Sequence, residues 1–145
     1  MDANTIVKNK ELLSVPSDSV TVEEGEEIAR ILMGILLESN TGIGLAANQI
    51  GINKRVCIIH ADKPIILINP LIVFKKGSVL FREGCLSFPD DEVTTQRYSH
   101  IEVKAANHEE ILTFSRDKNL LECVCVQHEI DHLNGITMHE RESMR

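Results

Sequence analysis

Apolar and polar residues alternate with a helical period between residues 21 and 39, TVEEGEEIARILMGILLES. The apolar positions that recur three or four residues apart, and so share one face of a helix, are Ile28, Ile31, Leu32, Ile35 and Leu36. Thr21 and Glu24 have the spacing of a capping box, and the acidic first turn suits the positive end of the helix dipole. The pattern therefore predicts an amphipathic helix over residues 21–39 that ends near Gly42.

The middle of the chain consists of short β-branched segments separated by turn residues such as NP, KKG and NHEE. The segments are RVCIIH, PIILINP, LIVF, SVLF, EVTTQRYSHIEVKAAN and EILTFS. Their composition and spacing predict strands in a mostly antiparallel arrangement. A helical pattern returns from about Lys118 in DKNLLECVCVQHEIDHLNG, and Gly135 is expected to end it. The order helix, strands, helix favours an α+β fold over alternating βαβ units.

Size and charge limit the classes of function. A chain of 145 residues is expected to form one domain, residues 1–145. The formal net charge of −7 argues against nucleic acid and against an anionic membrane surface as partners. No apolar run approaches the roughly 20 residues that span a bilayer, and the N-terminus lacks the pattern of a signal or transit peptide. We therefore expect a cytoplasmic protein whose four cysteines are reduced.

The stretch QHEIDHLNG, residues 127–135, contains the pattern H-E-x-x-H. His128 and His132 lie one helical turn apart on the same face, so both imidazoles can reach one metal ion. Glu129 lies beside such a site and can take a proton from a water on the metal. The alternative is two helix histidines that are close by coincidence, but a buried pair of unliganded imidazoles needs other partners.

A catalytic metal site usually has three protein ligands and an open position for water, so a third ligand is expected elsewhere in the chain. The candidates are His60, His100, His108, His139, a carboxylate or a cysteine. In REGCLSFPD, Cys85 lies in an apolar segment with turn residues on both sides. Taken alone, this pattern favours a buried structural thiol, because free cysteine is among the most buried residue types.

The stretch TGIGLAANQIGI, residues 41–52, combines two glycines with small residues and Gln49. It is typical of a helix stop and turn before a packed helix–strand junction. It also suits a close approach of the backbone to a ligand, with the Gln49 side chain in a cleft. A phosphate-binding loop is a poorer interpretation, because no Lys or Ser/Thr follows at the required spacing.

Together, GIGLAANQ, EGCLS and HEIDH resemble the three motifs of the peptide deformylase family, in the family's order, and the resemblance extends from Thr21 to Ile136. It implies that Cys85, His128 and His132 hold a metal, typically Fe(II), with Zn(II), Ni(II) or Co(II) as substitutes. It implies removal of the formyl group from N-formylmethionyl nascent peptides, with release of formate. It also implies an α+β fold in which strands wrap around a central metal-binding helix.

The resemblance further implies roles for individual residues. Glu129 would accept the proton of the attacking water and pass it to the leaving amine. The Gln49 amide and the Leu86 backbone N–H would stabilise the charge that develops on the formyl oxygen. Backbone contacts to the peptide would come from Ile43, Gly44 and Gly84, and the methionine pocket would be lined by Ile43, Phe81, Leu121, Val124 and Cys125. The alternative for each pocket residue is plain core packing.

Two features depart from the family's familiar pattern. Glu92 lies where members often carry a basic residue near the peptide, which predicts weaker binding of acidic peptides or a shifted preference. The chain has a short C-terminus after the metal-binding helix, where many members continue, so docking to the ribosome, a candidate partner, is in question. We expect a monomer.

Three rival interpretations remain open. A zinc protease of the H-E-x-x-H type would take its third ligand from downstream, with His139, Glu140 and Glu142 as candidates. A non-catalytic metal-binding module would need a closed site with four ligands. A globular domain without any site would require all three motifs to be coincidences.

Overall fold

The computed structural model describes residues 5–143. Its helices are α1 (Lys10–Leu13), α2 (Val22–Ser39) and α3 (Arg116–Leu133), with 3₁₀ turns η2 (Ala47–Ile50) and η3 (Met138–Arg141). Its strands are β1 (Gly44–Ala46), β2 (Val56–His60), β3 (Pro64–Ile68), β4 (Leu71–Lys76), β5 (Val79–Cys85), β6 (Phe88–Arg97), β7 (His100–Lys104) and β8 (Leu112–Ser115). The predicted strand segments all contain strands, whereas α1, β1, η2 and η3 were not predicted.

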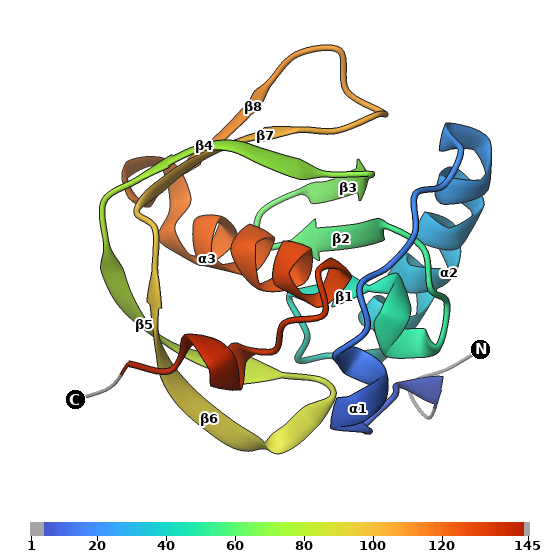
Figure 1. The fold of residues 1–145 in the computed structure, drawn as a ribbon, viewed down its shortest axis with the longest axis horizontal. Coiled ribbons are helices and arrows are strands. Elements are labelled where there is room, and N and C mark those ends of the chain that lie inside the picture. The colour runs from blue at the N-terminus through green and yellow to red at the C-terminus, as the bar shows by residue number, and fades with distance from the viewer. Residues whose placement is uncertain (1–4, 144–145) are drawn as a thin grey trace.

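The strands form three small antiparallel sheets, ordered β1-β2-β3, β4-β7-β8 and β5-β6. Helix α3 crosses the middle of the molecule, with β4, β7 and β8 on one side of it and β5 and β6 curving around another, while α2 lies at the right-hand edge (Figure 1). The predicted α+β fold, with mostly antiparallel strands around a central helix, is therefore confirmed.

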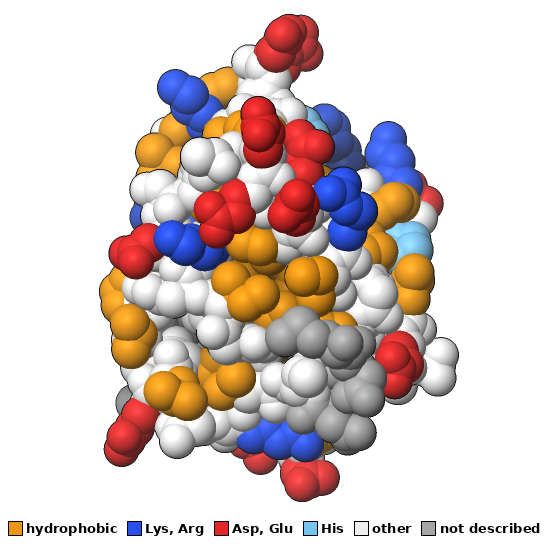
Figure 2. Space-filling model, turned by 90° about the vertical axis from the view of Figure 1, so that its right-hand side faces the viewer, with side chains coloured by type: hydrophobic (Ala, Val, Ile, Leu, Met, Phe, Trp, Pro, Cys, Tyr) orange, Lys and Arg blue, Asp and Glu red, His pale blue; other side chains and the backbone are white. Residues whose placement is uncertain are grey.

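Helix α2 begins and ends as its sequence predicts. The Thr21 hydroxyl accepts a hydrogen bond from the Glu24 backbone N–H at 3.2 Å, and Asn40 ends the helix in the left-handed region, with φ 64°. The predicted apolar face is buried except at Ile31, which is 39% exposed, so the prediction was wrong at that position. Figure 2 shows the side of the molecule on which α2 lies, where acidic side chains gather above a group of apolar ones.

Strand β2 lies between the two long helices and explains why VCIIH is almost continuously apolar. Successive side chains of a strand point to opposite faces. Val56 and Ile58 belong to the core that includes α2, and Cys57 and Ile59 belong to the core that includes α3. Both faces of the strand are thus buried, so the first sheet lies between α2 and α3.

Helix α3 is central and starts slightly earlier than predicted, at Arg116 rather than about Lys118. It has an irregular residue, Asn119 (φ −166°, ψ 103°), whose side chain accepts from the Glu122 N–H at 3.0 Å and so caps the longer part of the helix. Every residue from Cys123 to Leu133 is buried. Gly135 follows the helix with φ 76°. A Cβ added there would lie 2.6 Å from the Ser14 carbonyl oxygen, so glycine is needed where the helix was predicted to end.

Within residues 5–143, none of the helices is long and apolar enough to cross a membrane.

Candidate metal centre and active-site pocket

The three motifs meet at one pocket of about 350 Å³ between the turn before β1, strand β5 and helix α3. Its lining includes twelve of the thirteen predicted site residues: Ile43, Gly44, Gln49, Phe81, Gly84, Cys85, Leu86, Leu121, Val124, Cys125, His128 and Glu129. The thirteenth, His132, is buried directly behind His128. Residues far apart in the chain are therefore brought together as predicted, although their chemical roles stay predictions.

Three potential ligand atoms converge at the inner wall of this pocket. The His132 Nε2 lies 3.2 Å from the His128 Nε2 and 3.4 Å from the Cys85 Sγ. One ligand atom from each of these three residues lies within 4.8 Å of the other two, the only such group of three or more among the described residues. Cys85 is partly exposed to the pocket and is thus not the buried structural thiol that its local sequence favours.

The donor set fits a divalent metal ion. The Glu83 carboxylate lies 2.8 Å from the His128 Nδ1, so this nitrogen carries a proton. Although burial lowers the pKa of His128, its hydrogen bonds with Cys85 and Glu83 raise that pKa well above the usual value, so a metal bound at the Nε2 would displace a proton. Burial and the positive charge of the neighbouring His128 hold the pKa of His132 well below its usual value, which favours a neutral imidazole at this position. Two imidazole nitrogens and one sulfur therefore face a common point, where a metal cation would take the place of the proton on His128. One thiolate and two imidazoles suit Zn(II) or Fe(II) in such a site.

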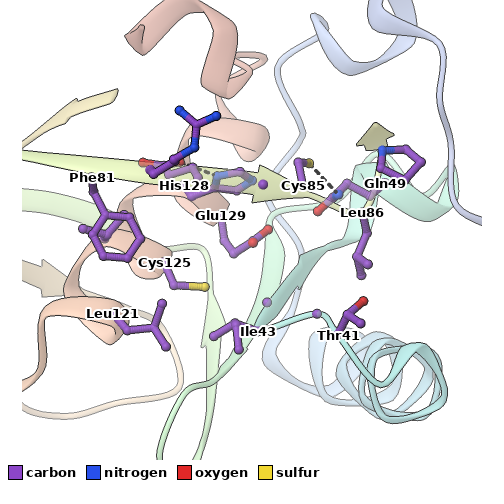
Figure 3. A pocket seen from close by; sticks show the side chains of 17 residues that line it. Thr41, Ile43, Gln49, Phe81, Cys85, Leu86, Leu121, Cys125, His128 and Glu129 are labelled. Atoms are coloured by element: carbon purple, nitrogen blue, oxygen red, sulfur yellow. Dashed lines mark hydrogen bonds and ion pairs between the residues drawn. The ribbon is translucent and has the colours of Figure 1, made fainter. Parts of the chain in front are cut away.

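Glu129 follows His128 on α3, and its side chain points into the pocket. In Figure 3 its carboxylate faces the part of the pocket where Cys85, Gln49 and Leu86 lie. Glu129 is 3% exposed, and burial raises the pKa of its carboxyl to about 7, with further raising by Glu83 and Asp131. Its Oε1 has no hydrogen-bond partner within residues 5–143. Because the Glu129 side chain lines the pocket, its carboxyl group is placed to exchange a proton with a molecule there.

The Gln49 side chain is held in one orientation. Its Oε1 accepts from the Ala46 N–H at 2.9 Å, so its NH₂ group faces the opposite way. That group donates to the Ser87 hydroxyl at 3.1 Å and lies 3.6 Å from the Cys85 Sγ. The 3₁₀ turn η2 thus aims an amide donor at the metal-binding side of the pocket. Leu86, directly after Cys85, begins the turn between β5 and β6.

The other side of the pocket is apolar, with Ile43, Phe81, Leu121 and Cys125 around an open space (Figure 3). Leu121 is 38% exposed, as a side chain at the pocket mouth, whereas Val124 is buried, with 1% of its surface exposed. The pocket therefore combines a polar, metal-binding end with a hydrophobic end large enough for a side chain.

The rival third ligands lie elsewhere. His139 pairs with Asp91 at 2.9 Å, His108 contacts the Ile66 carbonyl at 2.9 Å and His100 lies 3.4 Å from Glu102. His60 ends β2 and is not in the ligand group. Glu140 and Glu142, the downstream third-ligand candidates of the protease interpretation, are also outside that group.

Comparison with known proteins agrees with this geometry. The sequence model of the family described as polypeptide deformylase matches residues 4–145. The chain belongs to the peptide deformylase family. It is therefore a hydrolase that deformylates newly made peptides, and the family's reaction depends on a metal.

Peptide deformylases of several bacteria are similar over most of their length. That of Buchnera aphidicola is 37% identical over 131 residues, which cover 86% of this chain and 75% of that protein. That of Desulfitobacterium hafniense is 40% identical over 126 residues, which cover 85% of this chain and 81% of that protein. A crystal structure of the class I type b peptide deformylase from Acinetobacter baumannii with bound Met-Ala-Ser has a TM-score of 0.84 at 28% identity, covering 94% of this chain and 97% of that one. The crystal structure of the peptide deformylase from Synechococcus elongatus in complex with actinonin has a TM-score of 0.84 at 31% identity. The match covers 97% of this chain and 78% of that one.

Several residues of this deformylase pocket were not predicted from the sequence. They are the lining residues Thr41, Gly42, Arg82, Glu83 and Pro89, together with Ser87 beside Gln49. Glu83 is the most informative: burial would raise the pKa of its carboxyl, but Arg97 and His128 outweigh burial and lower it to about 2. The charged residue at the start of the motif EGCLS, two positions before Cys85, was the available signal for a buried partner.

Gly44 is expected to be indispensable because its missing side chain leaves room for Glu129. A Cβ at this position would lie 2.7 Å from the Glu129 Oε2 and 2.8 Å from the Cys125 Sγ. We predict that Gly44→Ala displaces the carboxylate and lowers kcat by about 100-fold, the typical cost of a misplaced group. The control is Gly34→Ala, where a Cβ meets nothing within 4 Å. A folded Gly44→Ala enzyme with the wild-type kcat would show that this contact does not position Glu129.

Proposed function

We propose that this deformylase hydrolyses the formyl amide of N-formylmethionyl peptides at the polar end of the pocket, with Cys85, His128 and His132 as metal ligands. The observation that carries the proposal is the convergence of these three ligand atoms beside the unpartnered, buried carboxylate oxygen of Glu129. An apolar cavity opens directly in front of them. A formyl group and a methionine side chain require such a combination.

Fe(II) is the metal that we propose for the native enzyme, with Zn(II), Ni(II) or Co(II) as functional substitutes. A donor set of one thiolate and two imidazoles accepts each of them. When bound, the metal supplies Lewis-acid chemistry, by which a water becomes a nucleophile near neutral pH and the formyl carbonyl is polarised.

Glu129 is the proposed proton carrier. Its unpartnered Oε1 is placed to accept a proton from water, and a carboxyl with a pKa near 7 can release that proton again at neutral pH. The same oxygen would then deliver the proton to the amine that leaves when the C–N bond breaks. Formate and a free N-terminal amine are the products.

Gln49 and Leu86 are the proposed donors to the oxyanion. Negative charge develops on the formyl oxygen during attack, and preorganised N–H groups stabilise it without reorganisation. The Gln49 side-chain amide is fixed because its Oε1 accepts from the Ala46 N–H and its NH₂ group donates to the Ser87 hydroxyl, which supports its part in this role. The Leu86 N–H is assigned from its position next to Cys85.

The peptide is proposed to lie between β1 and β5, which both line the pocket. Each of these strands pairs with one strand only among those described, so each has an edge available for an added strand. Ile43, Gly44 and Gly84 would contact the peptide backbone. Ile43, Phe81, Leu121, Val124 and Cys125 would surround the methionine side chain. The similar enzyme from Acinetobacter baumannii binds Met-Ala-Ser, which supports a short peptide as the ligand of this chain.

Glu92 is predicted to set a modest charge preference through Arg82, which lines the pocket. The two side chains form an ion pair, 64% and 59% exposed, of the kind that contributes at most about 1 kcal/mol. Glu92→Gln frees Arg82 for an acidic peptide residue. We expect kcat/KM for formyl-Met-Ala-Glu relative to formyl-Met-Ala-Lys to rise about two- to fivefold at low salt, with loss of the effect at high salt.

Exposed Glu23, at the start of α2, provides the matched control as Glu23→Gln. An unchanged ratio in Glu92→Gln, or an equal rise in the control, would contradict a local role for Glu92.

For the remaining properties we propose one catalytic domain, residues 1–145, acting as a monomer in the cytoplasm. Nascent peptides leave the ribosome with their formylated ends exposed, so the ribosome is the proposed place of encounter. The net charge of −7 supports contact through peptide and protein rather than through nucleic acid.

The proposed function is tested against the protease alternative by offering the metal-loaded protein three peptides. They are formyl-Met-Ala-Ser, acetyl-Met-Ala-Ser and a longer unblocked peptide. We expect formate from the first, little acetate from the second and no cleavage of internal bonds in the third. Internal cleavage without formate release would favour a protease and contradict the proposal.

A further inference from the structure

A line of alternating charges leads from His128 away from the pocket. The Glu83 Oε1 accepts from the His128 Nδ1 at 2.8 Å. Arg97 holds both oxygens of Glu83, with Nε–Oε2 at 2.6 Å and Nη2–Oε1 at 2.8 Å. The Arg97 Nη1 donates to the Asp131 Oδ2 at 2.6 Å. Arg141 then holds both oxygens of Asp131, each at 3.0 Å. The line thus connects a predicted metal ligand to the chain's C-terminal segment.

The inner members of this line are buried. The side chains of Glu83 and Arg97 are each 3% exposed and that of Asp131 is 10% exposed, whereas that of Arg141 is 43% exposed. Two carboxylates and two guanidinium groups give a net charge of zero. Buried charges tolerate desolvation only when they are fully paired. Loss of a member therefore leaves its neighbour in the line without one of its charged partners.

Arg141 is held in place by contacts with β6 as well as with α3. It belongs to the strap, defined here as residues 136–143, which includes η3. The Ser143 N–H donates to the Thr94 carbonyl at 2.8 Å, and the His139 ring pairs with Asp91 at 2.9 Å. The same ring meets Phe88 edge-on, with centroids 4.7 Å apart. These contacts attach the strap to strand β6 and so hold Arg141 in a fixed position next to Asp131 on α3.

We propose that Arg141 is a positioning residue for the metal ligand His128, acting through Asp131, Arg97 and Glu83. The Asp131 Oδ2 is shared by Arg97 and Arg141, while its Oδ1 bonds to Arg141. Without Arg141, the Asp131 carboxylate is free to turn toward Arg97 and to compete with Glu83 for its N–H groups. Glu83 is the acceptor that orients the His128 ring, so the Nε2 would lose its fixed direction.

This inference rests on the proposed role of His128 as a metal ligand. The test uses protein loaded with one equivalent of Co(II), whose visible absorption reports the ligand geometry. Two quantities are measured in the wild type, Arg141→Ala, Arg141→Lys and the control Arg30→Ala, an exposed arginine on α2. They are the Co(II) spectrum and the rate at which an excess of chelator removes the metal. Melting temperatures are recorded beside them.

In Arg141→Ala the Co(II) bands are expected to shift and the metal to leave about 3- to 10-fold faster, below the 10- to 100-fold effect of direct partners of a ligand. In Arg141→Lys the band shift and the rate of metal loss should lie between those of Arg141→Ala and those of the wild type. The reason is that one ammonium group cannot hold both oxygens of Asp131 as the guanidinium group does. Arg30→Ala should match the wild type. If Arg141→Ala does not fold, Arg141→Lys carries the test.

A lower melting temperature with an unchanged spectrum and rate of metal loss would overturn the proposal, since Arg141 would then only stabilise the fold. A wild type that binds no Co(II) through His128 would overturn it together with the metal site. Formate release is measured on the same samples. A wild type that binds Co(II) without releasing formate contradicts the proposed function alone, and the shift in Arg141→Ala would still support the positioning role.

Discussion

Replacing Glu129 by glutamine is expected to lower kcat by about 100- to 10,000-fold, the usual contribution of a general acid–base residue. Glutamine keeps the size of the side chain and removes its ability to carry a proton. The wild-type carboxyl is buried, has a pKa of about 7 and presents an oxygen without a partner among the described residues. Because Glu129 is not among the three proposed ligands, the metal content should remain at one per chain.

The measurement is steady-state formate release beside metal analysis of the same preparation. KM should change much less than kcat, because the carboxylate acts on the proton that moves in the transition state. A Glu129→Gln protein that binds metal and turns over at a near-normal rate would show that another group carries the proton.

Replacing Cys85 by alanine is expected to weaken metal binding by roughly 100-fold or more and to abolish formate release. Structural zinc sites with four ligands contribute about 10–16 kcal/mol, so one ligand of similar strength corresponds to about 3 kcal/mol. The Cys85 Sγ lies 3.4 Å from the His132 Nε2, where the three proposed ligand atoms converge. Competition with a chelator of known affinity measures the change.

Cys123→Ala is the matched control, because this cysteine is buried on α3 and its thiol contacts the Tyr98 carbonyl instead of the pocket. It should keep its metal and its activity. Cys85→Ala with unchanged metal affinity would favour a protease-type site with a ligand from the downstream segment.

Local signals in the sequence predicted the elements that hold the site. The cap at Thr21 and the periodicity of residues 21–39 indicated α2, and the spacing of His128 and His132 required a helix for both to face one metal. The pairing of strands into three separate sheets was not predictable in this way. Strand β4 pairs with β7 across intervening segments, and nothing in either strand alone identifies its partner.

The buried ionic line could not be predicted either. Glu83, Arg97, Asp131 and Arg141 come from β5, β6, α3 and the strap, and charged residues in a sequence are ordinarily interpreted as exposed. Only the packing of β5 and β6 against α3 brings them together. The exposure of Ile31 has a similar origin, since the first sheet covers only part of the apolar face of α2.

The most direct test of the central claim is an anaerobic titration of metal-free protein with Fe(II), followed by formate release from formyl-Met-Ala-Ser. The Cys85, His128 and His132 site predicts no release without metal and a linear rise in rate that levels off at one Fe(II) per chain. Formate release by the metal-free chain would contradict that claim, as would a chain that binds one Fe(II) and releases none.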